Sequence, residues 1–331
     1  MSININGEAS GCVLTGMTPS ATLAPLVLAA LLSWLPSHIA AQDVPRRATR
    51  GEDRHTLTYA GRERTYVVRA PHGLLRTSDP VPVVVVLHGG GGHAANAESM
   101  TGFTRLVERE RILVVYPEGT GRRPDRLLTW NAGHCCSYAM DNSVDDVGFI
   151  AALLDTLAAR YAVDPARIYA TGMSNGAMMA HRLGRELSHR FAAIGPVVGA
   201  LFGDEPPGRG PVAALSINGL LDEAVPPSGG PTGGRSAREW DGTPTRPNLE
   251  QGTYWARANG CDPTPTREER GPVITWRYVC PAGQDVEVWQ IKDNGHAWPG
   301  GQRGSRLGDM ASTAIVATDL LWAFFEAHPK R

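Results

Sequence analysis

The sequence predicts a doubly wound α/β fold built on a mostly parallel sheet, and two patterns indicate it. Residues 82–88 (PVVVVLH) and 112–116 (ILVVY) are continuous apolar runs, which are typical of strands buried on both faces. Residues 147–161 instead place apolar side chains at helical spacing on one face. Buried strands that alternate with amphipathic helices form parallel sheets covered by helices on both sides.

The remaining elements follow from the same periodicities. We expect an N-terminal β-hairpin at 55–70, helices at 98–109, 176–188 and 312–327, and strands at 167–171, 193–199, 212–218 and 285–291. Two Gly/Pro-rich stretches, 203–211 and 225–247, follow strands of the second half. We expect them to cover the carboxyl edge of the sheet, where ligands bind in open α/β folds.

The N-terminal residues have the pattern of a targeting segment. Residues 22–35 (TLAPLVLAALLSWL) are apolar but too short for a comfortable membrane span, and small residues follow as far as Ala41. We predict a signal peptide at 1–41, a linker at 42–54 and one catalytic domain at 55–331, in a secreted or periplasmic protein without a stable membrane span after processing. An uncleaved anchor is the alternative, and the true start codon stays open.

Charge and cysteine content narrow the class of protein. The net charge is −1 and no basic run is present, which argues against a nucleic-acid partner. No metal-ligand spacing stands out, so we expect neither a metal nor a cofactor. Removal of the leader leaves four cysteines, and their spacing favours a disulfide between Cys261 and Cys280, worth about 3 kcal/mol in the chain-entropy model. Cys135 and Cys136 could form a vicinal disulfide or remain two buried thiols.

The strongest chemical signal is the pattern Gly-x-Ser-x-Gly centred on Ser174. The expected strand 167–171 precedes it and a helix follows, which is the strand–turn–helix arrangement that presents the nucleophile in an α/β-hydrolase fold. The glycines are needed because side chains would collide in so tight a turn. A chance pentapeptide is the alternative, and the expected strand before it and helix after it argue against that interpretation.

A serine nucleophile needs a base, and in this fold the chain order is serine, acid, histidine. His296 lies in a loop just after strand 285–291, and Asp222 closely follows strand 212–218. We predict His296 as the general base and Asp222 as the acid that orients it, with Glu223 as the second choice for the acid. The alternatives are a solvated loop histidine and a turn aspartate.

The segment His88-Gly89-Gly90-Gly91-Gly92 leaves the strand at 82–88. Glycines there let the backbone approach a substrate, so we expect the amides of Asn175 and of Gly90 or Gly91 to form an oxyanion hole. A polyglycine turn without such a role is the alternative.

Two further pairs of residues carry weaker expectations. Trp130 and Trp298 are candidates for a substrate-binding wall, although plain packing explains them equally well. Asp145 and Asp146 precede the helix at 147–161 and are expected to serve its positive N-terminus.

Several motifs together resemble one family. They are LHGGGG at 87–92, WNAGHCC at 130–136, VDDVGFI at 144–150, GMSNGA at 172–177 and GHAWPGG at 295–301. From about residue 55 onward the chain is similar to the polyhydroxybutyrate depolymerase and feruloyl esterase (LpqC-like) group of α/β-hydrolases. The resemblance implies export and serine carboxylesterase chemistry on the same three residues. The segment around the acid departs from the family, because Asn218 stands where a histidine is usual and no aromatic residue follows Val225-Pro226.

We therefore expect an exported serine carboxylesterase that hydrolyses short or aromatic acyl esters through an acyl-enzyme. Polyhydroxybutyrate-type oligomers and feruloyl or acetyl esters all fit this chemistry, so the substrate is expected to be a small-molecule or oligomeric ester. The stretches 203–211 and 225–247 contain too few large apolar residues for the lid of an interfacial lipase. A serine peptidase of the same fold and a non-catalytic binding relative are the alternatives.

Overall fold

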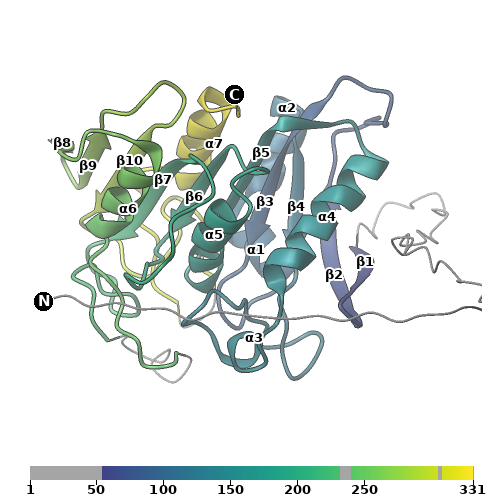
Figure 1. The fold of residues 1–331 in the computed structure, drawn as a ribbon, viewed down its shortest axis with the longest axis horizontal. Helices are drawn as coiled ribbons and strands as arrows, with labels where there is room; N and C mark the ends of the chain where they lie inside the picture. Colours follow the sequence, from purple (N-terminus) through teal and green to yellow (C-terminus); the bar gives the residue numbers. More distant parts are fainter. Residues whose placement is uncertain (1–53, 232–239, 305–307, 331) are drawn as a thin grey trace, which may run out of the picture. The chain divides into compact units, whose positions relative to one another are not determined.

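The computed structural model describes residues 54–231, 240–304 and 308–330, which form one ten-stranded sheet with helices on both faces (Figure 1). The predicted signal peptide at 1–41 and nearly all of the predicted linker lie outside the described residues. No helix in the described ranges is long and apolar enough to cross a membrane.

The strands are β1 (Arg54–Tyr59), β2 (Arg62–Arg69), β3 (Val81–Leu87), β4 (Leu113–Pro117), β5 (Val163–Met173), β6 (Ala193–Val197), β7 (Ala213–Gly219), β8 (Thr266–Arg270), β9 (Val273–Tyr278) and β10 (Val286–Ile291). The helices are α1 (Ala94–Thr101), α2 (Val107–Glu110), α3 (Ser137–Asp141), α4 (Asp146–Arg160), α5 (Asn175–Glu186), α6 (Leu249–Asn259) and α7 (Ala317–Ala327), with a 3-10 turn η1 (Phe103–Leu106).

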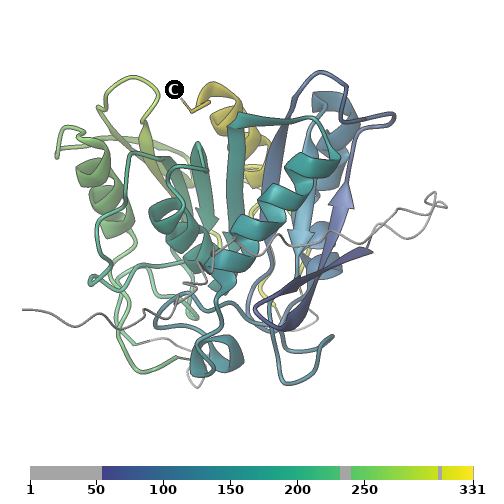
Figure 2. The same ribbon diagram turned by 45° about the vertical axis from the view of Figure 1, so that its right-hand side comes forward.

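The sheet has the order β1-β2-β4-β3-β5-β6-β7-β10-β9-β8. Its six central strands, from β4 to β10, are parallel to one another, and an antiparallel hairpin closes each edge. The doubly wound, mostly parallel sheet and its N-terminal hairpin are therefore confirmed, and Figure 2 shows that hairpin at the edge of the sheet.

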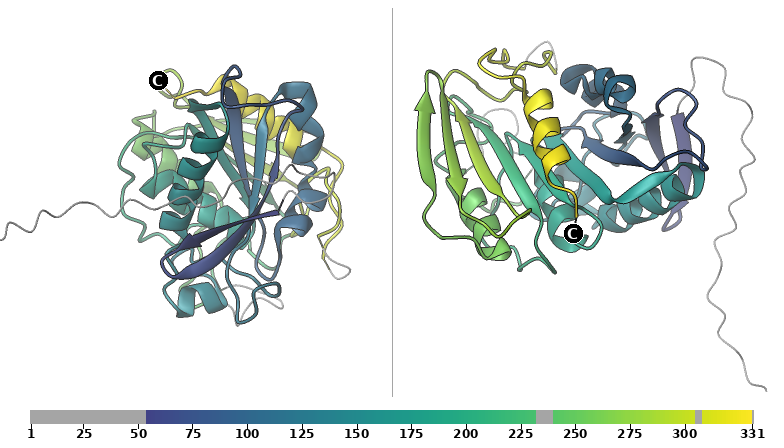
Figure 3. Two further views of the ribbon diagram at one scale, coloured as in Figure 1. Left: turned by 90° about the vertical axis from the view of Figure 1, so that its right-hand side faces the viewer. Right: turned by 90° about the horizontal axis from the view of Figure 1, so that it is seen from above.

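Two apolar layers hold the helices against the sheet. Phe149 of α4, Leu183 of α5 and Trp255 of α6 belong to the core on one face, whereas Leu321 and Phe325 of α7 pack with α1 and η1 on the other. Figure 3 shows the sheet lying between these two helical layers. Every residue of β3 and β4 is buried, as the two continuous apolar runs predicted.

Some predicted boundaries differ from the structure for local reasons. The helix expected at 98–109 is broken at Gly102, whose φ of 66° ends α1 in a left-handed cap. The closing helix begins at Ala317 rather than at 312. Ser312 is instead tied to the loop after β10, because its amide donates to Asn294 and its hydroxyl to Asp293.

Sequence periodicity predicted neither the helix α6 nor the strands β8 and β9. The five residues of β8 (TREER) are mostly exposed and lack the apolar alternation that would have marked a strand. Cys261, just after α6, and Cys280, just after β9, are joined by a disulfide in the structure.

Candidate active site

Ser174 occupies the tight turn between β5 and α5. Its φ of 57° lies in the left-handed region, which is strained for a residue with a side chain. A Cβ on Gly172 would lie 2.7 Å from the backbone of Gly176, and one on Gly176 would lie 2.5 Å from the carbonyl oxygen of Leu87. The two glycines of the motif are therefore required by close backbone packing.

His296 and Asp222 come from the loops after β10 and β7. His296 Nδ1 lies 2.8 Å from Asp222 Oδ2, and the other carboxylate oxygen accepts the backbone amides of Ala224 and Val225 at 2.9 and 2.8 Å. The Asp222 side chain is only 2% exposed and that of His296 20%. Glu223, the second choice for the acid, is exposed.

Ser174 and His296 line the same cavity, which has a volume of about 370 Å³. The cavity lies at one edge of the sheet because β3, β5, β7 and β10 are parallel, so the loops after their carboxyl ends meet there. Among the described residues Ser174 Oγ has no hydrogen-bond partner. Contacts between nucleophile and base are often long before substrate binds.

The glycine-rich loop after β3 folds back on itself. The amide of Gly91 donates to Leu128 O at 2.8 Å, and that of Gly92 donates to Gly89 O at 3.0 Å. The prediction that Gly91 could donate to an oxyanion is therefore wrong, because its N–H is already used within the fold. The amides of Gly90 and Asn175 have no partner among the described residues, and both residues line the cavity.

His88 holds this loop in place. The Gly119 amide donates to its Nε2 at 3.0 Å, so the ring proton sits on Nδ1, which donates to Gly89 O at 2.7 Å. Burial lowers the pKa of His88 to about 4, and the ring is therefore neutral near pH 7. A neutral imidazole that makes these two hydrogen bonds fixes the path of the chain into Gly90.

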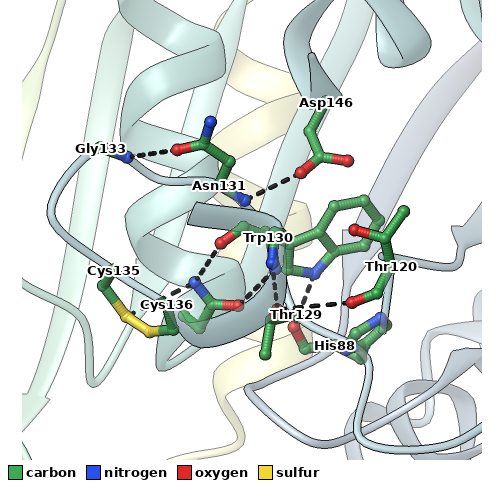
Figure 4. Close-up of a disulfide and its surroundings, with 11 residues drawn as sticks. His88, Thr120, Thr129, Trp130, Asn131, Gly133, Cys135, Cys136 and Asp146 are labelled. Atoms are coloured by element: carbon green, nitrogen blue, oxygen red, sulfur yellow. Dashed lines mark hydrogen bonds between the residues drawn. A yellow bond between two sulfur atoms is a disulfide. The ribbon is translucent and has the colours of Figure 1, made fainter. Parts of the chain in front are cut away.

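Trp130 and Trp298 do not form a substrate wall, so that prediction is wrong. Trp130 is fully buried and its Nε1 donates to His88 O at 2.9 Å, as Figure 4 shows. Trp298 is 1% exposed and donates to Thr318 Oγ1 at 3.0 Å. Among the described residues, the tryptophan that does line the cavity is Trp240.

The Asn175 side chain has a second role that the sequence did not indicate. Its oxygen accepts the Trp130 amide at 2.7 Å, and its nitrogen donates to Trp130 O at 2.9 Å. This double contact fastens the segment 130–136 to the start of α5, directly after the nucleophile.

The segment 130–136 is also held from its other side. Asp146 is fully buried, pairs with Arg64 at 2.6 Å and accepts the Asn131 amide at 2.8 Å (Figure 4). Asp145 caps α4 as expected by accepting from Gly148 at 2.8 Å, whereas Asp146 mainly anchors this segment.

Cys135 and Cys136, which the sequence left open, form a vicinal disulfide in the structure (Figure 4). Cys136 lines the catalytic cavity. One cysteine of the vicinal disulfide thus forms part of the cavity lining.

Asp309 is a further residue at the site that sequence reasoning missed. Its Oδ2 accepts the backbone amide of His296 at 2.6 Å, and the residue lines the cavity. A Cβ on Gly295 would lie 2.3 Å from the same oxygen. No sequence signal marks an acidic residue in a polar loop, because its role depends on the folding of that loop onto the histidine.

The fold and the site define the chain as an α/β-hydrolase: a serine on a strained strand-to-helix turn shares a cavity with a histidine–aspartate pair at the carboxyl edge of the sheet. A solved structure, "Acetyl xylan esterase from Aspergillus awamori", matches with a TM-score of 0.52 and 14% identity over 74% of this chain and 94% of that one. At that identity the match supports the fold alone.

Sequence comparison then gives the family. The family model described as "Esterase PHB depolymerase" matches residues 64–216. "Putative esterase NocK" of Nocardia uniformis subsp. tsuyamanensis is 31% identical over 286 residues, which cover 80% of this chain and 81% of that protein. "Feruloyl esterase B" of Piromyces equi is 27% identical over 73% of this chain and 44% of that protein. The chain belongs to the polyhydroxybutyrate depolymerase and feruloyl esterase family of α/β-hydrolases, and it is a serine hydrolase that acts on carboxylic ester bonds.

Proposed function

We propose that this protein is an exported carboxylesterase that hydrolyses short or aromatic acyl esters, with Ser174 as nucleophile, His296 as general base and Asp222 as the acid that orients the histidine. The observation that carries the proposal is the 2.8 Å contact between His296 Nδ1 and the buried Asp222 carboxylate, at a cavity that Ser174 also lines.

The proposed reaction has two halves. Ser174 Oγ attacks the ester carbonyl while His296 Nε2 takes its proton. The amides of Gly90 and Asn175 stabilise the resulting oxyanion. The imidazolium, held by Asp222, then returns the proton to the departing alcohol and leaves an acyl-enzyme. A water molecule activated by the same histidine hydrolyses that acyl-enzyme and restores the serine.

The cavity supports a substrate of modest size. Its volume of about 370 Å³ is near the lower end of ligand pockets in general, and its large apolar lining residues are Met100, Met173, Val225 and Trp240. A compact pocket with one aromatic wall suits an acetyl, hydroxybutyryl or hydroxycinnamoyl group better than a long fatty acyl chain.

A substrate panel tests this proposal. We would compare kcat/KM for methyl ferulate, a hydroxybutyrate oligomer, p-nitrophenyl acetate, emulsified triolein and a peptide amide, with Ser174→Ala as the inactive control. One of the first three should be preferred, and its hydrolysis should disappear in the control. Preference for triolein with activation at the oil–water interface would contradict the proposed acyl range, and preference for the amide would indicate a peptidase.

Export is the second part of the proposal. It is supported by the apolar stretch at 22–35 and by the pairing of all four described cysteines into two disulfides. N-terminal sequencing of exported protein should begin near residue 42. Non-reducing peptide mapping should recover one peptide pair that joins Cys261 to Cys280. Retention of residues 17–35, or free thiols at both cysteines, would contradict it.

A further inference from the structure

His134 lies outside the catalytic residues, yet both of its ring nitrogens are bonded to carboxylates. Nδ1 lies 2.6 Å from Asp241 Oδ2 and Nε2 lies 2.8 Å from Asp204 Oδ2. The His134 side chain is 28% exposed, whereas those of Asp204 and Asp241 are 66% and 38% exposed. A single imidazole thus joins three loops that are far apart in the sequence.

The geometry indicates the charge of this ring. An ionised carboxylate only accepts hydrogen bonds, so two carboxylates on one imidazole require a proton on each nitrogen. Burial alone would lower the pKa of His134, but the hydrogen bonds to Asp241 and Asp204 outweigh it and raise the pKa above its usual value. The cation therefore persists to higher pH than in an ordinary histidine and is lost as the pH rises through this raised pKa.

His134 is connected to the wall of the catalytic cavity. Its carbonyl oxygen accepts the Asp241 amide at 3.2 Å, and the neighbouring residues Cys135 and Trp240 form an isolated β-bridge. The Phe202 ring lies 5.0 Å from the His134 ring and 5.5 Å from the Trp240 ring, between centroids. Trp240 in turn lines the cavity with Ser174.

The Trp240 ring lacks a polar anchor of its own. Its indole Nε1 is buried without a hydrogen-bond partner among the described residues. A buried N–H without a hydrogen bond costs free energy, so it cannot hold the ring in place. The position of the ring must therefore be maintained by its neighbours. Besides the core against which Trp240 packs, these neighbours include the Phe202 ring and Cys135, which bridges to Trp240 next to the His134 contacts.

Within the described ranges, the other charged groups near this cluster are already paired. Glu205 accepts the amides of Phe202 and Gly203 at 2.5 and 2.8 Å. Arg246 packs against Gly203 and pairs with Glu250 at 2.8 Å. Thr243 Oγ1 lies 3.1 Å from His134 Nδ1 and carries no charge.

We propose that His134 is a positioning residue: as an imidazolium between Asp204 and Asp241 it holds Trp240 in the wall of the catalytic cavity and so sets the preference for bulky esters. The kinetic part of this inference rests on the proposed function. The structural part concerns only the placement of Trp240 and can be tested without any substrate.

The structural test uses ¹⁹F NMR of protein labelled with 5-fluorotryptophan, in which Trp240→Phe identifies the Trp240 resonance. In the otherwise unchanged protein this resonance should shift or broaden as the pH rises through the pKa of His134. The transition should be absent in His134→Gln, which cannot become charged. Asp204→Asn is a milder second variant at a mostly exposed position, and it should move the transition to lower pH because it removes one of the carboxylates that favour the cation.

A matched control is available at the other end of the chain. His328 Nε2 lies 2.7 Å from Asp285 Oδ2, and its Nδ1 lies 2.6 Å from Phe324 O, but it does not line the cavity. His328→Gln should leave the Trp240 transition unchanged. A transition that persists in His134→Gln would belong to another group such as His296 and would overturn the proposal, as would a resonance that is independent of pH.

The kinetic test separates ester size from catalysis. Methyl ferulate has a bulky acyl group, 2-naphthyl acetate has a bulky alcohol group, and methyl acetate has neither. His134→Gln should lower kcat/KM roughly 2- to 10-fold for at least one of the bulky esters, the range expected for a lost aromatic contact, and should leave methyl acetate unchanged. In a Trp240→Ala background the same substitution should have no further effect.

Equal losses for all three esters, or an undiminished effect of His134→Gln in the Trp240→Ala background, would refute the positioning role. Absence of ester hydrolysis by the unmodified protein would instead refute the proposed function, and the NMR result would still decide whether His134 holds Trp240.

Discussion

The sharpest test of the proposed triad is the substitution Asp222→Asn, because the structure gives this carboxylate two separable tasks. One oxygen faces His296 Nδ1, and the other accepts the amides of Ala224 and Val225. Asparagine can keep its oxygen on the two amides while its NH₂ group faces His296. Nδ1 would then have to accept a hydrogen bond, so the ring proton would move to Nε2, where it blocks removal of the proton from Ser174.

The expected magnitudes follow from these contacts. A wrong tautomer costs about 10⁴-fold in kcat, or about 5 kcal/mol of transition-state stabilisation. The unfolding free energy of Asp222→Asn should change little, since both amides remain satisfied. Asp222→Ala leaves two amides without their acceptor, and at about 1–3 kcal/mol each this should destabilise the fold by roughly 2–6 kcal/mol.

The assay is kcat for p-nitrophenyl acetate, together with urea unfolding of both variants. Asparagine should abolish most of the activity without unfolding the protein, whereas alanine should lower both activity and stability. If Asp222→Asn kept more than a tenth of the original kcat, the acid would have to be another residue. If it lost as much stability as Asp222→Ala, the assignment of the two oxygens would be wrong.

Three other predictions follow. Ser174→Ala should lower kcat by at least about 10³-fold, and adding His296→Ala should cost little more because the two act as a unit; a double variant much worse than either single one would contradict this. The free energy of unfolding should fall as the pH drops from about 6.5 toward 4. Burial lowers the pKa of both His88 and His181 to about 4, so in this range the unfolded chain binds protons that the folded chain does not. Equal stability to urea at pH 7 and pH 4.5 would be inconsistent with this. Asp309→Ala should reduce kcat/KM by roughly 5- to 30-fold while Asp309→Asn, which keeps an acceptor for the His296 amide, should retain most of it; the same loss in both would show that the charge matters rather than the hydrogen bond.

Local sequence patterns were sufficient for the sheet and for the candidate nucleophile. The strands β3 and β4 are marked by continuous apolar residues because both of their faces are covered. The turn at Ser174 is marked by glycines because a Cβ on Gly172 or Gly176 would lie within 2.7 Å of backbone atoms. Such signals are readable because the physical constraint and the residues that satisfy it lie within a few positions of each other. The edge hairpin of β8 and β9 escaped this reasoning, since an exposed strand carries no such constraint.

What the sequence alone determined is thus the fold class, the candidate serine and histidine and the family motifs, each of which is written in a short stretch of chain. The tertiary structure alone decided which chemically plausible groups remain free at the site. Trp130 and Trp298 are buried in the core, and the Gly91 amide donates its hydrogen bond to Leu128 O. Trp240 takes the place expected of the first two. The physical reason is that burial and hydrogen bonding depend on partners distant in the sequence, which a local pattern cannot predict.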